Sequence, residues 1–185
     1  SREHFEFYAF SFGPDSDDAM RRRVVATFDE FIDVRTRSDR VVAELSRRMG
    51  IDIAVDLKGF TKDSRPGMFA ARCAPVQVNY LGYPGTIGAT FVDYIIADKI
   101  LIPPDARENY SESVVYLPGS YQPNDAKRRI SDRIFTRTEL GLPETGFVFC
   151  CFNNPFKITP STFDSWTRIL KGVDGSVLWL LRDSP

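Results

Sequence analysis

The stretch FVFCCFNNPFKITPSTFDSWTRILKGVDGSVLWLL, residues 147–181, decides the fold class. Its apolar run from Phe147 to Phe152 predicts a strand of the kind that is buried on both faces. Thr159 suits the N-cap of a following helix, which is predicted from Pro160 to Lys171. The run from Val177 to Leu181 then predicts a second buried strand. Strand, helix and strand in this order form one βαβ unit, which requires parallel pairing.

The same alternation extends through the upstream sequence. Apolar or β-branched runs predict strands at residues 5–12, 51–57, 76–81, 94–97 and 114–117. Helices are predicted from a Ser16 cap through Met20, Val24, Phe28 and Phe31, from a Ser38 cap to Gly50, and over residues 67–72. The sequence therefore predicts an α/β fold with parallel sheets.

The segment from Pro103 to about Arg137 differs in composition from its flanks. It is rich in proline and charge and contains only one convincing strand. We therefore predict that it is peripheral and that its end marks a lobe boundary. This divides the chain into residues 1–137 and residues 138–185.

Composition excludes several classes of protein. The 185 residues carry 24 Lys and Arg against 25 Asp and Glu, and 43% of them are hydrophobic. A chain of this length can bury about 70% of the surface of its unfolded form, so disordered and fibrous proteins are excluded. The near-neutral charge also argues against nucleic-acid binding through many phosphate contacts.

Cysteine usage and the length of the apolar runs bear on localisation. The three cysteines match neither a disulfide framework nor a zinc-ligand spacing, so we expect a reducing, cytoplasmic setting. The longest apolar runs fall far short of the ~20 residues of a spanning helix, and no membrane association is expected. Neither an initiator Met nor a signal region precedes the first predicted strand, so we expect part of a longer protein.

The loop after the strand at residues 147–152 is the first candidate site. Lys157 lies two residues before the cap of the predicted helix, and that helix is expected to direct its free N–H groups at the loop. A lysine adds a full charge with mobile donors. The arrangement suits an anion, and phosphate is the anion expected. An ordinary loop with a solvent-facing lysine remains the alternative from the residues alone.

The second candidate is LGYPGTIGA, residues 81–89, at the end of another predicted strand. Its glycines allow close backbone approach, and Pro84-Gly85 suits a type II turn. Neither a dinucleotide-binding nor a P-loop fingerprint is present. Open α/β sheets place ligands at the carboxyl ends of their strands, although a purely structural turn fits these residues equally well.

Other residues that could take part in catalysis or binding give weaker evidence for a site. His4 is the only histidine, so no Ser/His/Asp or Cys/His set can be assembled around it. Asp52 and Asp56 fit both a site carboxylate near the carboxyl end of their strand and a solvent-facing residue. Cys150 and Cys151 are expected on opposite faces of a strand, which argues against a vicinal redox pair. The arginines at 21–23 are interpreted as a solvated helix face with balancing acids.

The two loops, in this order and at this spacing, resemble the catalytic region of the O-linked N-acetylglucosamine transferases, glycosyltransferase family 41, in its bacterial and plant-like branch. LGYPGT and FNNPFKITP carry the most specific part of the resemblance, because generic strand or helix patterning explains neither. The blocks that resemble the family are FEFYAFSFGPDSDDAMRRR (5–23), IDIAVDLKGFTKDSR (51–65), APVQVNYLGYPGTIGATFVDYIIAD (74–98), FVFCCFNNPFKITPSTFDSW (147–166) and SVLWLLR (176–182).

The resemblance implies a B-type glycosyltransferase. Residues 1–137 would belong to a Rossmann-like N-terminal lobe, and residues 138–185 would form the first βαβ unit of the C-terminal nucleotide-binding lobe. Such lobes usually follow an array of tetratricopeptide helices in the same polypeptide. The family transfers N-acetylglucosamine from UDP-N-acetylglucosamine to Ser or Thr hydroxyls of proteins, with inversion and with neither a bound metal nor another cofactor.

The resemblance also implies roles for individual residues. Lys157 matches the catalytic lysine that contacts the donor diphosphate, and Asn154 matches its polar neighbour in the same nucleotide site. The turn beside the donor sugar is matched by Leu81, Gly82, Tyr83 and Pro84.

Departures from the family limit what this segment is expected to do. The histidine proposed as catalytic base lies upstream of these blocks, and the block that grips uridine lies beyond residue 185, so we expect no activity from the segment alone. The animal enzymes have a histidine where Asp52 stands, which leaves the role of Asp52 open. A non-catalytic scaffold in a tetratricopeptide protein and a B-type enzyme for another nucleotide sugar remain alternatives. The sequence names neither the acceptor nor the oligomeric state.

Overall fold

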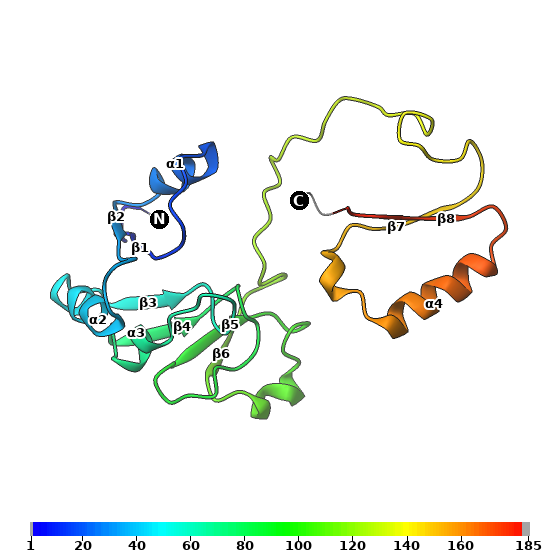
Figure 1. The fold of residues 1–185 in the computed structure, drawn as a ribbon. Helices are drawn as coiled ribbons and strands as arrows, with labels where there is room; N and C mark the ends of the chain where they lie inside the picture. Colours follow the sequence, from blue (N-terminus) through cyan, green and yellow to red (C-terminus); the bar gives the residue numbers. More distant parts are fainter. Residues whose placement is uncertain (1, 183–185) are drawn as a thin grey trace. The chain divides into compact units, whose positions relative to one another are not determined.

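The computed structural model describes residues 2–182, which form two compact units (Figure 1). The first unit ends at Asp125 and the second begins at Ala126. Residue 137, the expected lobe boundary, lies inside the second unit, in a segment without helix or strand. That boundary stays a prediction about the lobes.

The first unit contains two parallel sheets, as the alternation of strands and helices predicts. One sheet pairs β1 (Tyr8–Ser11) with β2 (Glu30–Asp33). In the other, four strands lie side by side (Figure 1) in the order β3 (Ile53–Asp56), β4 (Val76–Asn79), β5 (Tyr94–Ala97) and β6 (Ser113–Tyr116). The helices of this unit are α1 (Ala19–Val25), α2 (Asp39–Arg48), α3 (Gly67–Ala70) and the 3-10 helix η1 (Pro104–Asn109).

The helix α2 shows how the sequence builds the core of this unit. The Ser38 hydroxyl accepts a hydrogen bond from the Val41 N–H at the start of α2, and Gly50 has a φ of 70° just after its end, as the capping residues predict. One face of α2 buries Val42 and Ala43. The core cluster around this face consists of Val34, Val42, Ala43, Met68, Phe69 and Cys73. Burial raises the pKa of the Cys73 thiol.

The predicted helix through Phe28 and Phe31 is wrong in its extent. The helix α1 ends at Val25, and Phe31 lies in β2, opposite Ala9 of β1. Strand pairing therefore overrides the helical spacing of the aromatic residues. The cap also differs from the prediction, because Asp18 rather than Ser16 accepts the first-turn N–H.

The second unit confirms the predicted βαβ connection. It contains β7 (Val148–Cys151), the 3-10 helix η2 (Pro155–Lys157), α4 (Pro160–Lys171) and β8 (Val177–Leu180), with β7 and β8 parallel (Figure 1). No helix in residues 2–182 is long and apolar enough to cross a membrane.

Burial on both faces of β7 and β8, by contrast, is wrong for the described residues. Cys150 is exposed and its neighbours in β7 are half-buried. The helix α4 contains no buried residue, and Phe163 and Ile169 of its apolar stripe are each 48% exposed. A two-stranded sheet with one helix leaves one face of the sheet open, so β7 and β8 are not covered on both sides within this unit.

Candidate functional site

The loop that follows β4, residues 80–89 and here called the β4 loop, packs against the chain that follows β3. The two strands are parallel neighbours, so their carboxyl ends lie at the same edge of the sheet. A Cβ at Gly82 would overlap the backbone carbonyl oxygen of Leu57, and a Cβ at Gly59 would lie 2.6 Å from the Cβ of Tyr83. Glycine is required at both positions because backbone passes directly over backbone or side chain.

The second residue of the β4 loop has a strained backbone. Leu81 has a φ of 76°, in the left-handed region. A non-glycine residue in a sparsely populated backbone region costs of order 1–3 kcal/mol and persists only where its surroundings enforce it. The contacts of the loop supply that enforcement.

Two buried polar side chains hold the β4 loop. Asn79, the last residue of β4, is fully buried and donates its amide N–H groups to the carbonyl oxygens of Tyr83 and Gly85, each at 3.1 Å. Glu112, just before β6, is 4% exposed and accepts from the Ile87 N–H at 2.6 Å and the Thr86 hydroxyl at 2.7 Å. The loop is therefore fixed by one side chain from β4 and one from the residue that precedes β6.

Sequence reasoning missed Asn79 and Glu112. The signal for Asn79 is a polar residue where the alternation of the run Val76 to Leu81 leads into the loop. For Glu112 the sequence gives no local signal, because its role depends on a contact 25 residues away in the chain.

The two aspartates near β3 have different positions. Asp56 ends β3, and its Oδ1 accepts the N–H groups of Lys58 and Gly59 at 2.9 and 3.0 Å. This carboxylate therefore shapes the turn. Asp52 precedes Ile53, the first residue of β3, and is exposed. The expectation that Asp52 lies near the carboxyl end of the strand is wrong.

The loop that follows β7, residues 152–159 and here called the β7 loop, has side-chain hydrogen bonds only to near neighbours in sequence among the described residues, and the Phe152 ring packs edge-on against Trp179 of β8. Asn154 caps η2 by accepting the Phe156 N–H at 3.5 Å. Thr159 caps α4 as predicted, since its hydroxyl accepts the Thr162 N–H at 3.3 Å. Lys157, the last residue of η2, is exposed and forms no ion pair within residues 2–182. Its ammonium is therefore free to meet an anion near the start of α4.

The predicted site residues fall into two groups. Leu81, Gly82, Tyr83 and Pro84 lie together in the β4 loop of the first unit, and Asn154 and Lys157 lie together in the β7 loop of the second. The convergence of these loops on one donor stays a prediction.

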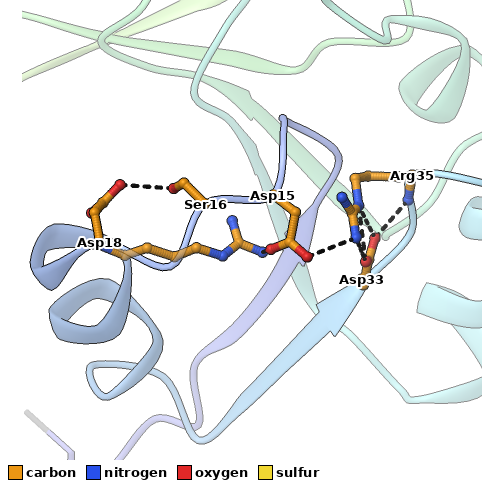
Figure 2. A network of polar contacts seen from close by, with 6 residues as sticks. Asp15, Ser16, Asp18, Asp33 and Arg35 are labelled. Atoms are coloured by element: carbon orange, nitrogen blue, oxygen red, sulfur yellow. Dashed lines mark hydrogen bonds and ion pairs between the residues drawn. The ribbon is translucent and has the colours of Figure 1, made fainter.

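Arginines near the loop after β1 are engaged with aspartates. Arg35 bonds Asp33 at 2.5 Å and Asp15 at 3.3 Å (Figure 2), and Arg21 lies 3.2 Å from Asp15. The hydrogen bond from the Arg35 guanidinium lowers the pKa of Asp33 to about 2. In the run 21–23, the other two arginines also pair with aspartates. This agrees with the interpretation of charges balanced by neighbouring acids.

The geometry gives no support to His4 as a functional residue. His4 is exposed and lies in a turn ahead of β1. Within residues 2–182, no three His, Cys, Asp or Glu side chains are grouped so as to hold a metal ion.

Comparison with known proteins identifies the family. The profile of the family described as glycosyl transferase family 41 matches residues 1–132 and 124–184. This chain belongs to glycosyltransferase family 41. An Arabidopsis thaliana protein of the family, named "Probable UDP-N-acetylglucosamine--peptide N-acetylglucosaminyltransferase SEC", is 37% identical over 98% of this chain. A second Arabidopsis thaliana protein, named "Probable UDP-N-acetylglucosamine--peptide N-acetylglucosaminyltransferase SPINDLY", is 37% identical over 86% of this chain.

A solved structure supports the same family and confirms the fold class. A mutant O-GlcNAc transferase from Thermobaculum terrenum superposes with a TM-score of 0.82 at 35% identity over 97% of this chain and 33% of that chain. The family 41 chain thus has the α/β fold of a B-type glycosyltransferase catalytic region. It spans about a fifth of the curated relatives, namely 19% of SEC and 17% of SPINDLY.

Proposed function

We propose that the protein containing this family 41 segment transfers N-acetylglucosamine from UDP-N-acetylglucosamine to Ser or Thr hydroxyls of acceptor proteins. The printed names of the relatives support the donor and the peptide acceptor. The observation that carries the proposal is the exposed Lys157, which forms no ion pair with any residue that the structure describes and lies two residues before the Thr159 cap of α4.

The proposed chemistry follows from charge development. As the glycosidic bond breaks, negative charge grows on the UDP phosphates. The Lys157 ammonium and the free N–H groups of α4 stabilise that charge and lower the barrier to departure. Asn154 lines the same nucleotide site, and the backbone at Leu81 to Pro84 lies beside the sugar and orients it for in-line attack.

The setting of this activity is part of the proposal. The reaction proceeds without a bound metal or another cofactor, in the cytoplasm, and the tetratricopeptide region of the same polypeptide presents the acceptor proteins. Nucleic acid and membrane are not partners in this scheme.

The test uses Lys157→Met in the complete protein, with Lys171→Met as the matched control. Lys171 is an exposed lysine at the far end of α4, so it shares the helix without facing its N-terminus. We expect Lys157→Met to slow transfer of radiolabelled N-acetylglucosamine about 10²–10³-fold, the effect of losing one such contact. Lys171→Met should retain full activity.

Three results separate the alternatives. Equal transfer by Lys157→Met and the parent protein would overturn the role of Lys157. UDP binding that is equally tight in both, with no transfer by either, would favour a non-catalytic scaffold. A preference for GDP-sugars over UDP-sugars in a hydrolysis screen would defeat the donor assignment.

A further inference from the structure

Two amide side chains on β4 invite comparison. Gln77 and Asn79 are two residues apart in the strand, so both point to the same face of the sheet. Both are fully buried. Gln77 donates to the carbonyl oxygens of Phe69 and Phe91, which ties strand, α3 and the following turn together. Asn79 donates only to the β4 loop. One amide therefore serves the core and the other serves the candidate site.

The orientation of the Asn79 amide is set by the loop. Both of its bonds run from Nδ2 to carbonyl oxygens, and a reversed amide would place Oδ1 against those same oxygens. In the orientation observed, Oδ1 is buried without a hydrogen-bond partner in the described structure. A buried polar atom without a partner is costly. Oδ1 of Asn79 therefore loses a hydrogen bond, whereas Nδ2 forms the two hydrogen bonds to Tyr83 and Gly85.

Glu112, which lies just before β6, holds the other end of the β4 loop. In the sheet order β3-β4-β5-β6, Glu112 directly precedes β6, two strands away from Asn79. Its two oxygens accept from the Ile87 N–H and the Thr86 hydroxyl. The middle of the loop, residues 83–87, is therefore anchored at both sides by buried groups.

We propose that Asn79 and Glu112 are positioning residues for the sugar-nucleotide donor. They hold the β4 loop in one conformation, in which Leu81 keeps its left-handed backbone and Gly82 stays against the Leu57 carbonyl. Because the loop is already ordered, donor binding does not incur the conformational-entropy cost of ordering it. This inference rests on the proposed function, because it concerns the same donor.

The experiment compares Asn79→Leu with Gln77→Leu in the complete protein. Each variant removes a fully buried amide from the same face of β4, so both are expected to lower stability. Only Asn79→Leu should raise KM for UDP-N-acetylglucosamine, by about tenfold, the equivalent of roughly one hydrogen bond. Gln77→Leu should leave KM unchanged at a temperature where both variants are folded by circular dichroism.

Hydrogen exchange of the unliganded protein provides a readout independent of activity. Asn79→Leu should speed amide exchange across residues 82–88 by at least about tenfold, whereas Gln77→Leu should not, because local opening of the loop becomes easier. Equal loop exchange in the two variants, or KM changes that merely follow the loss in stability, would overturn the inference.

A milder pair keeps the inference testable if Asn79→Leu does not fold. Glu112→Gln retains an acceptor for the Ile87 N–H and should keep the loop exchange and KM near those of the parent protein. Glu112→Ala should speed exchange of the Ile87 amide and raise KM. Fast exchange in Glu112→Ala without any UDP-N-acetylglucosamine binding by the parent protein would instead show that the proposed function has failed while the loop anchor stands. Unchanged exchange in Glu112→Ala would refute the anchor.

Discussion

The β4 and β7 loops follow parallel strands and contain the predicted donor-site residues, yet they are built in opposite ways. Asn79 and Glu112 fix the β4 loop from inside the protein. The β7 loop is held by bonds between near neighbours in sequence and exposes Phe156 and Lys157. The β4 loop presents backbone held in one conformation, whereas the β7 loop presents the exposed ammonium group of Lys157.

Physical chemistry favours this division. Backbone that orients a sugar must not move, because small displacements are costly in rate. An ammonium group is strongly hydrated when it is exposed to solvent. The exposed Lys157 ammonium is therefore hydrated, and an anion that binds it must displace this water.

The largest expected effect on stability comes from a substitution that disrupts the packing of the β4 loop. Gly82→Ala places a methyl group on the Leu57 carbonyl oxygen, so loop or strand must shift, and we expect a loss of about 3 kcal/mol in the free energy of unfolding. Gly88→Ala is the control, since its φ is 66° but no atom lies within 4 Å of the new Cβ, and it should cost only about 1 kcal/mol. Urea denaturation measures both. Equal losses would show that the close contact at Gly82 carries no energetic weight.

A smaller effect is expected from acid, which acts at the base of the same loop. Asp98 accepts the N–H groups of Leu101, Tyr121 and Ile100, and these bonds lower its pKa. The Tyr121 carbonyl in turn accepts the Tyr80 hydroxyl at the start of the β4 loop.

The sign of the pH dependence follows from that shift. A carboxyl whose pKa is lower in the folded state stabilises the protein above its ordinary value of 3.8, and this contribution is lost as pH falls through the folded pKa. We expect stability to fall below about pH 4, and Asp98→Asn to flatten that fall. Denaturation midpoints between pH 5 and pH 2 measure it. An identical pH profile for Asp98→Asn would contradict the assignment.

The smallest expected effect concerns the β7 loop. Thr159→Ala removes the cap of α4 and should cost about 1 kcal/mol, seen as faster amide exchange in the first turn of α4. Exchange in the β4 loop should stay unchanged, because Thr159 bonds only within its own turn. Faster exchange in both loops would show that they are coupled and that the contrast between them is too simple.

Local patterns predicted most of the elements and both loops. The βαβ unit at residues 147–181 and the Ser38 and Thr159 caps could be predicted because strand runs, capping residues and helix spacing are local signals. The helix through Phe31 was wrong because strand pairing with β1 decides that segment. Burial of β7 was wrong because an apolar run does not reveal how much of the protein covers it.

The candidate site could be predicted in part. The glycines of the β4 loop and Lys157 stand out in the sequence, whereas Glu112 acts through contacts to Thr86 and Ile87 across the sheet. Such contacts depend on strand order, which local patterns do not specify.

The three cysteine thiols differ in burial, and this difference allows selective chemical labelling. Cys73 is enclosed and its thiol pKa is raised, so little reactive thiolate forms there. Cys150 is exposed and Cys151 is half-buried, both on β7. A maleimide dye at neutral pH should therefore label the second unit in preference to Cys73 of the first, and replacing Cys151 by serine would leave Cys150 as the one exposed thiol on β7.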